Sequence, residues 1–389
     1  MVQSLQDAVI VEAVRTPIGR GHPEKGLFRD VHPALLLGRV YSAVIEQSGI
    51  DPEQVDHALC GCVYQIAEQA AGITRTAWLQ EGLPEQTAAT TVDVRCGSGQ
   101  QAVNLAALRI ATGVDEVVVA GGVEHMGRVG FPVNEGAQER WGRAFTSRLL
   151  QRYQLVPQGE GAELIADRWG ISQEEMDALS AASHRRAAAA TAAGAFAREI
   201  VPVEAGGAMH DADQGIRPDT TEAVLAGLRP AFRSGGRVTA GNSSQISDGA
   251  AGLLLTSAAK AKRLGLRARA RIVDQVAVGV DPITMLTGPI PATARILERN
   301  GLTIGDLDLV EVNEAFASVV LAWQREHDAD PERVNVRGGA IALGHPLGAS
   351  GARLLTTLLH ALEDRDGELG LVTMCCAGGI GTATLIQRL

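Results

Sequence analysis

Residues 91–122, TVDVRCGSGQQAVNLAALRIATGVDEVVVAGG, contain the clearest structural pattern in the chain. The apolar residues 91–94 predict a strand, and a glycine-rich turn that holds Cys96 follows them. The next residues predict a helix that ends near Ala111, and VVVAGG at 117–122 predicts a second strand. Strands that alternate with helices in this way are typical of a layered α/β fold.

The same order of elements recurs near the C-terminus. Residues 334–336, predicted as a strand, lead into a glycine turn that holds His345. A helix at 352–362, a strand at 369–374 and a second glycine turn are predicted to follow. The repetition predicts two similar α/β halves, each of which brings a turn at a strand end to a shared centre. In α/β sheets, ligand sites form where strand ends and helix N-termini converge.

The N-terminal segment and the middle of the chain complete this prediction. Residues 8–14 are apolar and predict a buried strand, and residues 34–49 predict an amphipathic helix that Gly49 ends. Residues 123–240 differ, because they are rich in Arg, Glu and Gln and contain isolated helical patches such as 174–190. We expect this region to cover the site and to bind the remote part of a substrate. The alternative is an ordinary peripheral helical domain.

The composition disfavours several classes of function. A chain of 389 residues is long enough for two or three domains, and its net charge of −10 argues against nucleic acid or an anionic membrane as the main partner. It has no run of 18 apolar residues and no N-terminal basic segment followed by a long apolar run. We therefore expect no membrane span, no signal peptide and a cytoplasmic location. The five cysteines have no regular spacing, so we expect no disulfide framework.

Cys96 and His345 are the candidates for a nucleophile and its base. Cys96 lies between a predicted strand and a glycine-rich helix start, where unpaired backbone N–H groups and the helix dipole favour a thiolate. His345 precedes Pro346, which favours an extended or turn conformation at the histidine. Histidine is the usual partner of a cysteine nucleophile. The alternatives are a small buried thiol at 96 and a histidine on a surface turn at 345.

Two more segments contribute reactive groups. Cys375 and Cys376 precede a glycine turn, and we interpret one of them as an acid/base thiol whose neighbour points away from the site. A metal or redox role is the alternative, but neither this pair nor Cys60-Gly-Cys62 has a common zinc or redox spacing, and we predict no metal. Asn313 follows an apolar run, where its amide can hold a water or a carbonyl; a plain cap is the alternative. Together these residue types predict covalent acyl transfer by cysteine.

These segments, in this order, match a known family. The matching segments are VRTP at 14–17, CGSG at 96–99, GGVEHM at 121–126, LRPAF at 228–232, TAGN at 239–242, DGA at 248–250, NEAFA at 313–317, GGAIALGHP at 338–346 and the final cysteine-glycine turn. The chain resembles the thiolases over essentially its whole length. The resemblance implies two similar α/β halves in a layered α-β-α-β-α arrangement with an inserted loop domain.

The resemblance also implies domain limits and partners. Residues 1–120 and 245–268 would form the N-terminal half, residues 121–244 the inserted loop domain that covers the site and binds CoA, and residues 269–389 the C-terminal half. CoA and acyl-CoA would be substrates, with no bound cofactor. The family pairs through its core sheets, which implies a homodimer or a homotetramer.

The roles of the site residues follow from the same resemblance. Cys96 would take the acyl group as a thioester. His345 would activate it and, with a water bound to Asn313, would polarise the thioester carbonyl of the other acyl-CoA. Cys375 would move the proton to or from the thiol of CoA or the α-carbon of acetyl-CoA. The backbone N–H groups of Cys96 and Ala377 would form the second oxyanion hole.

The candidate CoA contacts, and two positions at which this chain differs from the usual sequence of the family, bear on the choice of substrate. Arg217, in RPDTT, matches a loop arginine near the nucleotide end of CoA, with a plain surface arginine as the alternative; Ser244, in NSSQ, matches a serine that contacts the pantetheine. The final motif of the family usually has the form Cys-x-Gly-Gly-Gly, so the methyl group of Ala377 would narrow the pocket. Short-chain biosynthetic thiolases carry His-Met where this chain has VPQG at 156–159, which disfavours an enzyme restricted to acetoacetyl-CoA.

Three segments, GCVYQIAEQ at 61–69, CGSGQQ at 96–101 and SSQISD at 243–248, are most similar to actinobacterial degradative thiolases, a group that includes enzymes of steroid side-chain β-oxidation. We therefore predict a 3-ketoacyl-CoA thiolase that works by a ping-pong mechanism through acyl-Cys96. The alternatives are a biosynthetic acetoacetyl-CoA thiolase, an inactive protein that binds acyl-CoA, and a cysteine hydrolase.

Overall fold

The computed structural model describes residues 5–389; residues 1–4, which begin the predicted N-terminal half, lie outside the described residues. The strands are β1 (Ala8–Arg15), β2 (Gly19–Arg20), β3 (His57–Gly61), β4 (Ala88–Val92), β5 (Val117–His125), β6 (Val203–Ala205), β7 (Ala208–His210), β8 (Ser247–Ser257), β9 (Ala270–Gly279), β10 (Leu309–Val312), β11 (Leu369–Cys376) and β12 (Ile380–Arg388). The helices are α1 (Pro33–Ser48), α2 (Ile73–Gln80), α3 (Ser98–Ala111), α4 (Phe131–Trp141), α5 (Ser147–Arg152), α6 (Gln158–Arg168), α7 (Gln173–Ala192), α8 (Glu222–Ala226), α9 (Ala258–Leu264), α10 (Pro289–Asn300), α11 (Ala317–His327), α12 (Ala340–Leu343) and α13 (Leu347–Arg365). Over the described part of the chain, every helix is too short or too polar to cross a membrane.

The main sheet consists of two halves that repeat one pairing pattern. Its strand order is β10-β11-β12-β9-β1-β8-β5-β3-β4, with β2 paired to β8. In one half β3–β5 is parallel and β5–β8 and β8–β1 are antiparallel; in the other, β10–β11 is parallel and β11–β12 and β12–β9 are antiparallel. The halves join where β1 and β9 pair through Val9 with Arg271 and Ile10 with Ala270. The predicted repetition of two α/β halves is confirmed.

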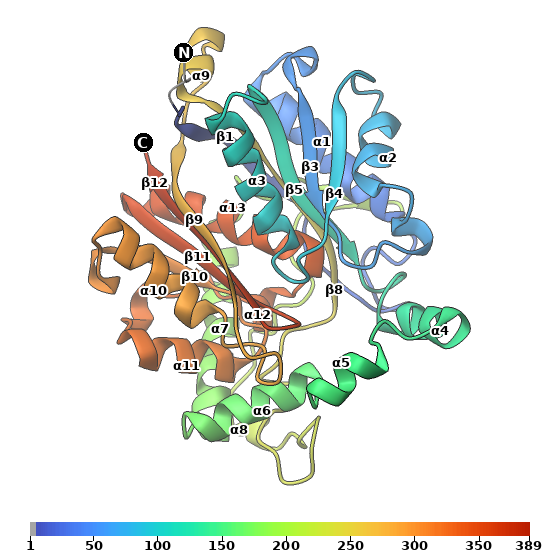
Figure 1. Ribbon diagram of the computed structural model, residues 1–389, viewed down its shortest axis with the longest axis vertical. Helices are drawn as coiled ribbons and strands as arrows, with labels where there is room; N and C mark the ends of the chain where they lie inside the picture. The colour runs from blue at the N-terminus through green and yellow to red at the C-terminus, as the bar shows by residue number, and fades with distance from the viewer. Residues whose placement is uncertain (1–4) are drawn as a thin grey trace.

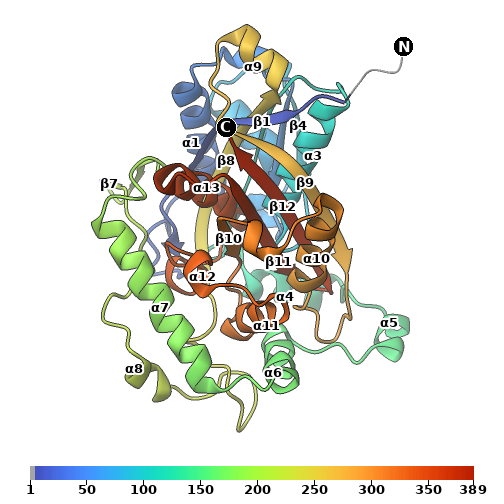
Figure 2. The ribbon, with the colours of Figure 1, turned by 90° about the vertical axis from the view of Figure 1, so that its left-hand side faces the viewer.

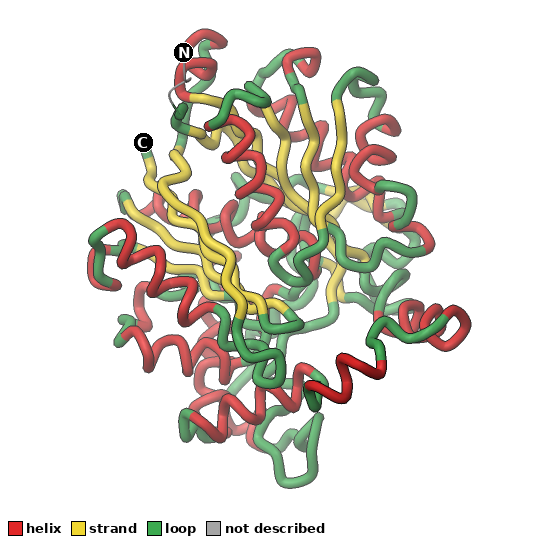
Figure 3. The backbone as a smooth tube through the Cα atoms, in the orientation of Figure 1, coloured by secondary structure: helices red, strands yellow, loops and turns green. Residues whose placement is uncertain are grey.

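Helices α3 and α13 lie between the two halves of the sheet (Figure 1). Helix α3 packs on β3, β5 and β8, whereas α13 contacts β5 and β8 of one half and β10 and β11 of the other. Helices α1 and α2 cover the outer side of the first half, and α10 covers the outer side of the second. The strands therefore form two groups with helices between and outside them, as Figure 3 shows. This is the expected α-β-α-β-α order of layers.

The sequence of α13 explains its central place. From Leu347 to Leu362 every residue of the helix is buried, and a helix that is buried on all sides belongs in the interior of a protein. Its first turns, LGASGA at 347–352, consist mostly of small residues, which allow other backbones to approach. Helix α3 also begins with small residues, SG at 98–99.

Glycines allow the N-termini of α3 and α13 to touch. A Cβ atom at Gly99 would lie 2.6 Å from the carbonyl oxygen of Gly348, and one at Gly122 would lie 2.0 Å from the same oxygen. A Cβ atom at Gly348 would lie 2.4 Å from the oxygen of Val123 and 2.7 Å from that of Gly61. No side chain fits these contacts. The turns that hold Cys96 and His345 therefore meet at one place in the fold.

Several predicted boundaries differ from the structure; the helix expected at 352–362, for example, is α13 and begins at Leu347. The strand expected at 91–94 is β4 and ends at Val92. The strand expected at 334–336 is a loop, because only Val334 bridges to Val310 and Asn335 has a left-handed φ of 47°. The expected limit between residues 120 and 121 falls inside β5, which continues to His125.

The segment between β5 and β8 consists of helices, one hairpin and long loops. It contains α4–α8 and the β6–β7 hairpin, and α7 includes the helical patch expected at 174–190. Helices α4–α8 gather at the lower end of the molecule in both views (Figures 1 and 2). Helix α7 contacts α12, which directly precedes the His345 turn, so this segment lies beside the C-terminal half near that turn.

We expect Gly348→Ala to lower the free energy of unfolding by at least about 1 kcal/mol, because the added methyl group would overlap two backbone oxygens. Urea unfolding followed by circular dichroism measures this change. Gly136→Ala is the matched control, because Gly136 lies in α4 with open space around it and alanine favours helix. Equal stability of the two variants would contradict the packing argument.

Candidate active site

Cys96 lies in the turn between β4 and α3 and is 3% exposed. Arg95 before it has a left-handed φ of 52°, and the Ser98 hydroxyl accepts a hydrogen bond from the Val94 N–H group at 2.9 Å. The first N–H groups of a helix lack partners within the helix. The turn therefore places the thiol beside the N-terminus of α3.

Burial dominates the acidity of this thiol. It raises the pKa of Cys96 to about 11, while the backbone N–H groups of Ala377 and of Cys96 itself act in the opposite direction. The nearby Glu124 carboxylate also raises this pKa. The N–H groups favour the thiolate, but in the ligand-free protein burial outweighs their effect on the pKa. A base is needed to remove the proton.

His345 is fixed between α12 and α13 in a single tautomer. Its backbone N–H donates to the Ser247 hydroxyl at 3.0 Å, and its Nδ1 atom lies 2.6 Å from the Ser350 hydroxyl. That hydroxyl donates its one hydrogen to the carbonyl oxygen of Pro346 at 2.8 Å. It therefore accepts a hydrogen from Nδ1, which leaves the Nε2 atom unprotonated.

The imidazole of His345 is neutral at physiological pH. Burial lowers its pKa to about 3, and the positive charge of Arg353 acts in the same direction. The side chain is 5% exposed. A neutral imidazole whose Nε2 atom is unprotonated has the form that a general base requires.

Asn313 meets His345 from the end of β10. Its backbone N–H donates to the Thr373 carbonyl at 3.1 Å, and its Nδ2 atom lies 3.4 Å from His345 Nε2. The side chain is fully buried, and its Oδ1 atom has no hydrogen-bond partner among residues 5–389. A buried acceptor without a partner is costly, so this oxygen marks a place where a donor belongs.

Cys375 and Cys376 end β11, and their side chains lie on opposite faces of the strand. Cys376 faces α3, because a Cβ atom at Gly97 would lie 2.7 Å from its sulfur. Cys375 packs in an apolar cluster with Phe316 and Met285. Burial raises the pKa of both thiols, and a negative charge on Cys96 would raise them further, so both lie in the surroundings of Cys96.

Two residues of the site were not predicted from the sequence. Ser350 sets the tautomer of His345. The sequence signal that could have indicated this role is its position in the first turn of α13, five residues after the histidine. Glu124 is a buried carboxylate that accepts hydrogen bonds from the N–H groups of Val63 at 2.9 Å, Tyr64 at 3.1 Å and Gly348 at 2.9 Å. It joins the loop after β3 to the start of α13.

The candidate CoA residues lie in two different surroundings. Ser244 is half-buried, and its N–H donates to the carbonyl oxygen of Ala315 at 2.9 Å, two residues from Asn313. Arg217 is exposed in the loop before α8, and its backbone N–H donates to His184 Nδ1 at 3.1 Å. The structure therefore brings Ser244, but not Arg217, to the segment that carries Asn313.

Residues 156–159, where this chain differs from the short-chain biosynthetic thiolases, lie near Cys375. Val156 packs against the apolar cluster that contains Cys375, Met285 and Phe316. All five cysteines of the chain are buried and free. Among the residues that the structure describes, no group of three or more His, Cys, Asp or Glu side chains has an arrangement that could hold a metal ion.

Comparison with known proteins identifies relatives of this chain. The family model for the thiolase N-terminal domain matches residues 8–259, and that for the thiolase C-terminal domain matches residues 266–388. A protein of Mycobacterium tuberculosis named steroid 3-ketoacyl-CoA thiolase is 46% identical over 99% of this chain and 95% of its own length. A 3-ketoacyl-CoA thiolase of Aeromonas salmonicida is 44% identical over 99% of this chain and 100% of its own length. The crystal structure of the Bacillus anthracis acetyl-CoA acetyltransferase superposes with a TM-score of 0.92 at 38% identity, covering 99% of this chain and 100% of that one.

We expect the alkylation of Cys96 by iodoacetamide to accelerate about tenfold per pH unit between pH 7 and pH 9 in the ligand-free protein. Only the thiolate reacts, and with a pKa of about 11 its fraction grows throughout this range. Peptide mass mapping separates Cys96 from the other cysteines, and Cys96→Ala gives the background. A rate that levels off near pH 8 would show that burial does not control this thiol.

Proposed function

We propose a function for this chain on the premise that it belongs to the thiolase family. This membership confirms the family predicted from the sequence. The protein is an acyltransferase, and its proposed reaction is the cleavage of a 3-ketoacyl-CoA by CoA to acetyl-CoA and a shortened acyl-CoA. Relatives that carry the name 3-ketoacyl-CoA thiolase span nearly the whole chain at 44–46% identity. The reaction proceeds in two half-reactions through an acylated cysteine.

One observation carries the chemical part of this proposal. His345 is neutral, protonated on Nδ1 through Ser350 and unprotonated on Nε2, while the buried thiol of Cys96 is protonated. A protonated thiol and a neutral imidazole are the two partners of a proton transfer that creates the nucleophile. These groups lie in turns that meet at the glycine contact between α3 and α13.

In the first half-reaction, His345 Nε2 takes the proton of Cys96, and the sulfur attacks the 3-keto carbonyl carbon of the substrate. The bond between carbons 2 and 3 breaks, and its electron pair moves to carbon 2 and the thioester oxygen. Asn313, whose Oδ1 atom lacks a protein partner, holds a water that donates to this oxygen together with protonated His345. Cys375 then protonates carbon 2, which releases acetyl-CoA.

In the second half-reaction, the thiol of CoA gives its proton to the Cys375 thiolate. The CoA sulfur attacks the acyl carbonyl on Cys96, and the acyl oxygen is stabilised by the N–H groups of Cys96 and Ala377. The bond to Cys96 breaks, and His345 returns its proton to the leaving thiolate. Both N–H groups lower the pKa of the Cys96 thiol and therefore lie near its sulfur, which supports their role as the second oxyanion hole.

Two features favour substrates larger than acetoacetyl-CoA. A valine at 156 packs beside the Cys375 cluster where short-chain biosynthetic thiolases carry His-Met. The relatives named above include a protein described as a steroid thiolase. We propose that Ser244 contacts the pantetheine and that Arg217, exposed on its loop, contacts the nucleotide end of CoA.

We further propose the organisation of the protein in the cell. Residues 121–244, of which 121–125 complete β5, form the loop domain that covers the site, between the halves 1–120 with 245–268 and 269–389. Two or four copies assemble through their core sheets. The five free cysteines, one of them the nucleophile, favour the reducing cytoplasm as its location.

Incubation with a ladder of 3-ketoacyl-CoAs, in the absence of free CoA, is expected to add an acyl group to Cys96. Intact-protein and peptide mass spectrometry detect the adduct and its position. Cys96→Ala loses thiolysis and the adduct, whereas Cys60→Ala, a buried cysteine on the outer side of the sheet, retains both. An adduct on another residue, or none with any chain length, would refute the covalent mechanism.

The same series of 3-ketoacyl-CoAs also distinguishes the proposed function from its main alternative. The structural neighbour is named acetyl-CoA acetyltransferase, which favours a biosynthetic acetoacetyl-CoA thiolase as the second candidate function. Faster labelling and thiolysis with C8 or bulkier substrates supports the degradative function. A rate maximum at acetoacetyl-CoA supports the biosynthetic one.

Ser350→Ala is expected to lower kcat by about tenfold to a hundredfold with little change in KM. Without the hydroxyl, Nδ1 loses the partner that keeps its hydrogen in place, and a fraction of the imidazoles places the proton on Nε2, where it blocks the base. Ser350→Thr keeps the hydroxyl and is expected to retain most of the activity. Steady-state thiolysis measures both variants, and full activity in Ser350→Ala would remove the tautomer argument.

A further inference from the structure

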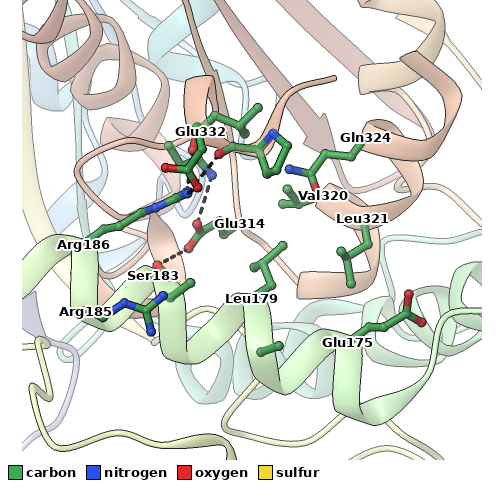
Figure 4. Close-up of a pocket in the computed structure, with 15 residues that line it drawn as sticks. Glu175, Leu179, Ser183, Arg185, Arg186, Glu314, Val320, Leu321, Gln324 and Glu332 are labelled. Atoms are coloured by element: carbon green, nitrogen blue, oxygen red, sulfur yellow. Dashed lines mark hydrogen bonds and ion pairs between the residues drawn. The ribbon is translucent and has the colours of Figure 1, made fainter. Parts of the chain in front are cut away.

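A cavity of about 370 Å³ lies behind the segment that carries Asn313 (Figure 4). Helices α7 and α11 and residues 331–335 line it, and Glu314 and Asn335 form part of its wall. Both are buried, with 2% of Glu314 and 3% of Asn335 exposed. Neither belongs to the catalytic set proposed above, although Glu314 is bonded directly to Asn313. Side-chain hydrogen bonds hold Glu314 and Asn335 in this wall.

The carboxylate of Glu314 joins three separate segments. Its Oε2 atom accepts hydrogen bonds from the Ser183 hydroxyl at 2.7 Å and from the Ile341 N–H at 3.1 Å, and its Oε1 atom accepts one from Asn335 Nδ2 at 3.0 Å. The Ser183 oxygen in turn accepts the N–H of Gly339 at 3.0 Å. A Cβ atom at Gly339 would lie 2.2 Å from the carboxyl carbon, so the contact requires glycine there.

Asn335 holds the residue that precedes Asn313. Its Oδ1 atom accepts the Val312 N–H at 2.8 Å, and its Nδ2 atom donates to the Val312 carbonyl at 2.9 Å. On the opposite edge β10 pairs with β11, so this side chain replaces a neighbouring strand at the end of β10. Asn335 adopts its left-handed backbone conformation at this point, a feature that persists only where the surroundings fix it.

These hydrogen bonds fix the two segments that carry Asn313 and His345, whose side chains contact each other. Glu314 is covalently linked to Asn313, and through Ile341 it holds α12, which ends at Leu343 just before the His345 turn. Asn313 Nδ2 and His345 Nε2 lie 3.4 Å apart. A displacement of about 1 Å between such groups can reduce a rate by about a hundredfold.

We propose that Glu314, supported by Asn335 and Ser183, is a positioning residue that fixes Asn313 and His345 relative to each other during thiolysis. The proposal rests on the thiolase function proposed above. A carboxylate suits this place because all three of its partners donate hydrogen bonds, and a glutamine would turn an NH₂ group toward at least one donor. Ser183 belongs to α7, so the helical segment between β5 and β8 takes part in holding the catalytic pair.

The test compares Glu314→Gln, Ser183→Ala and their combination with the wild-type protein in thiolysis. Glu314→Gln is expected to lower kcat by about tenfold to a hundredfold, with KM within about twofold, because it disturbs the reacting groups and leaves the substrate contacts intact. Single-turnover acylation of Cys96 is expected to slow by the same factor. The double variant is expected to lose less than the product of the two single effects, because both residues act through one carboxylate.

Asn335→Gly provides a second variant for the case in which Glu314→Gln fails to fold. Glycine accepts the left-handed backbone without strain, so this change removes only the side-chain amide, which binds both Val312 and Glu314. The same fall in kcat is expected. Glu332→Gln is the matched control, because Glu332 lies at the rim of the same cavity, its side chain is 82% exposed and it pairs with Arg186 only. It is expected to retain wild-type kcat.

The outcomes separate this inference from the proposed function. If the wild-type protein is active and the folded Glu314 and Asn335 variants keep its kcat, the positioning role is overturned and the thiolase function stands. A loss that appears equally in Glu332→Gln would also overturn it. If the wild-type protein forms no acyl-Cys96, the proposed function fails and the inference falls with it.

Discussion

The backbone contact between the first turns of α3 and α13 is the constraint on which the rest of the structure depends. Gly99 and Gly122 both lie against the carbonyl oxygen of Gly348, at distances that exclude a methyl group. This contact lets two helices from different halves start at one point, and each start carries a reactive turn, one with Cys96 and the other with His345. Glu124 holds the contact by accepting the N–H of Gly348 while it also binds the loop after β3.

Burial at this point has an electrostatic consequence. The centre excludes water so thoroughly that both reactive groups are uncharged at rest, with the thiol pKa near 11 and the imidazole pKa near 3. An ion pair between them would need strong compensation in such surroundings. In the proposed mechanism the thiolate therefore forms only as His345 takes the proton and the sulfur attacks the substrate carbonyl.

The sequence predicts the order of elements well, because strand and helix periodicity and glycine turns are local properties. It fails at 334–336, where Val334-Asn-Val has the composition of a strand but Asn335 uses its side chain to bond Val312 in place of a strand ladder. The pKa of Cys96 shows a related limit. N–H groups at a helix start are visible in a sequence, whereas the depth of burial depends on residues far apart in the chain.

The candidate site shows the same limit. Cys96, His345, Cys375 and Asn313 stand out because each belongs to a short motif of reactive and glycine residues. Glu314 lies inside one of these motifs, and Glu124 and Ser350 lie in or close to other matched segments. Their roles depend on which atoms they contact. A serine or a carboxylate has many ordinary uses, so its residue type alone does not indicate a role.

The repeated pairing pattern of the two sheet halves has a consequence for the origin of the fold. The halves share only two residue pairs in the sheet, and the much larger contact between them is the buried central layer of α3 and α13. A single half on its own would leave the inner side of its sheet and its central helix exposed to water. If one ancestral half was duplicated to give this chain, that ancestor had to work as a symmetric pair of identical subunits. The present division of labour, with the sulfur from one half and the imidazole from the other, then records a specialisation of two sites that began as equals.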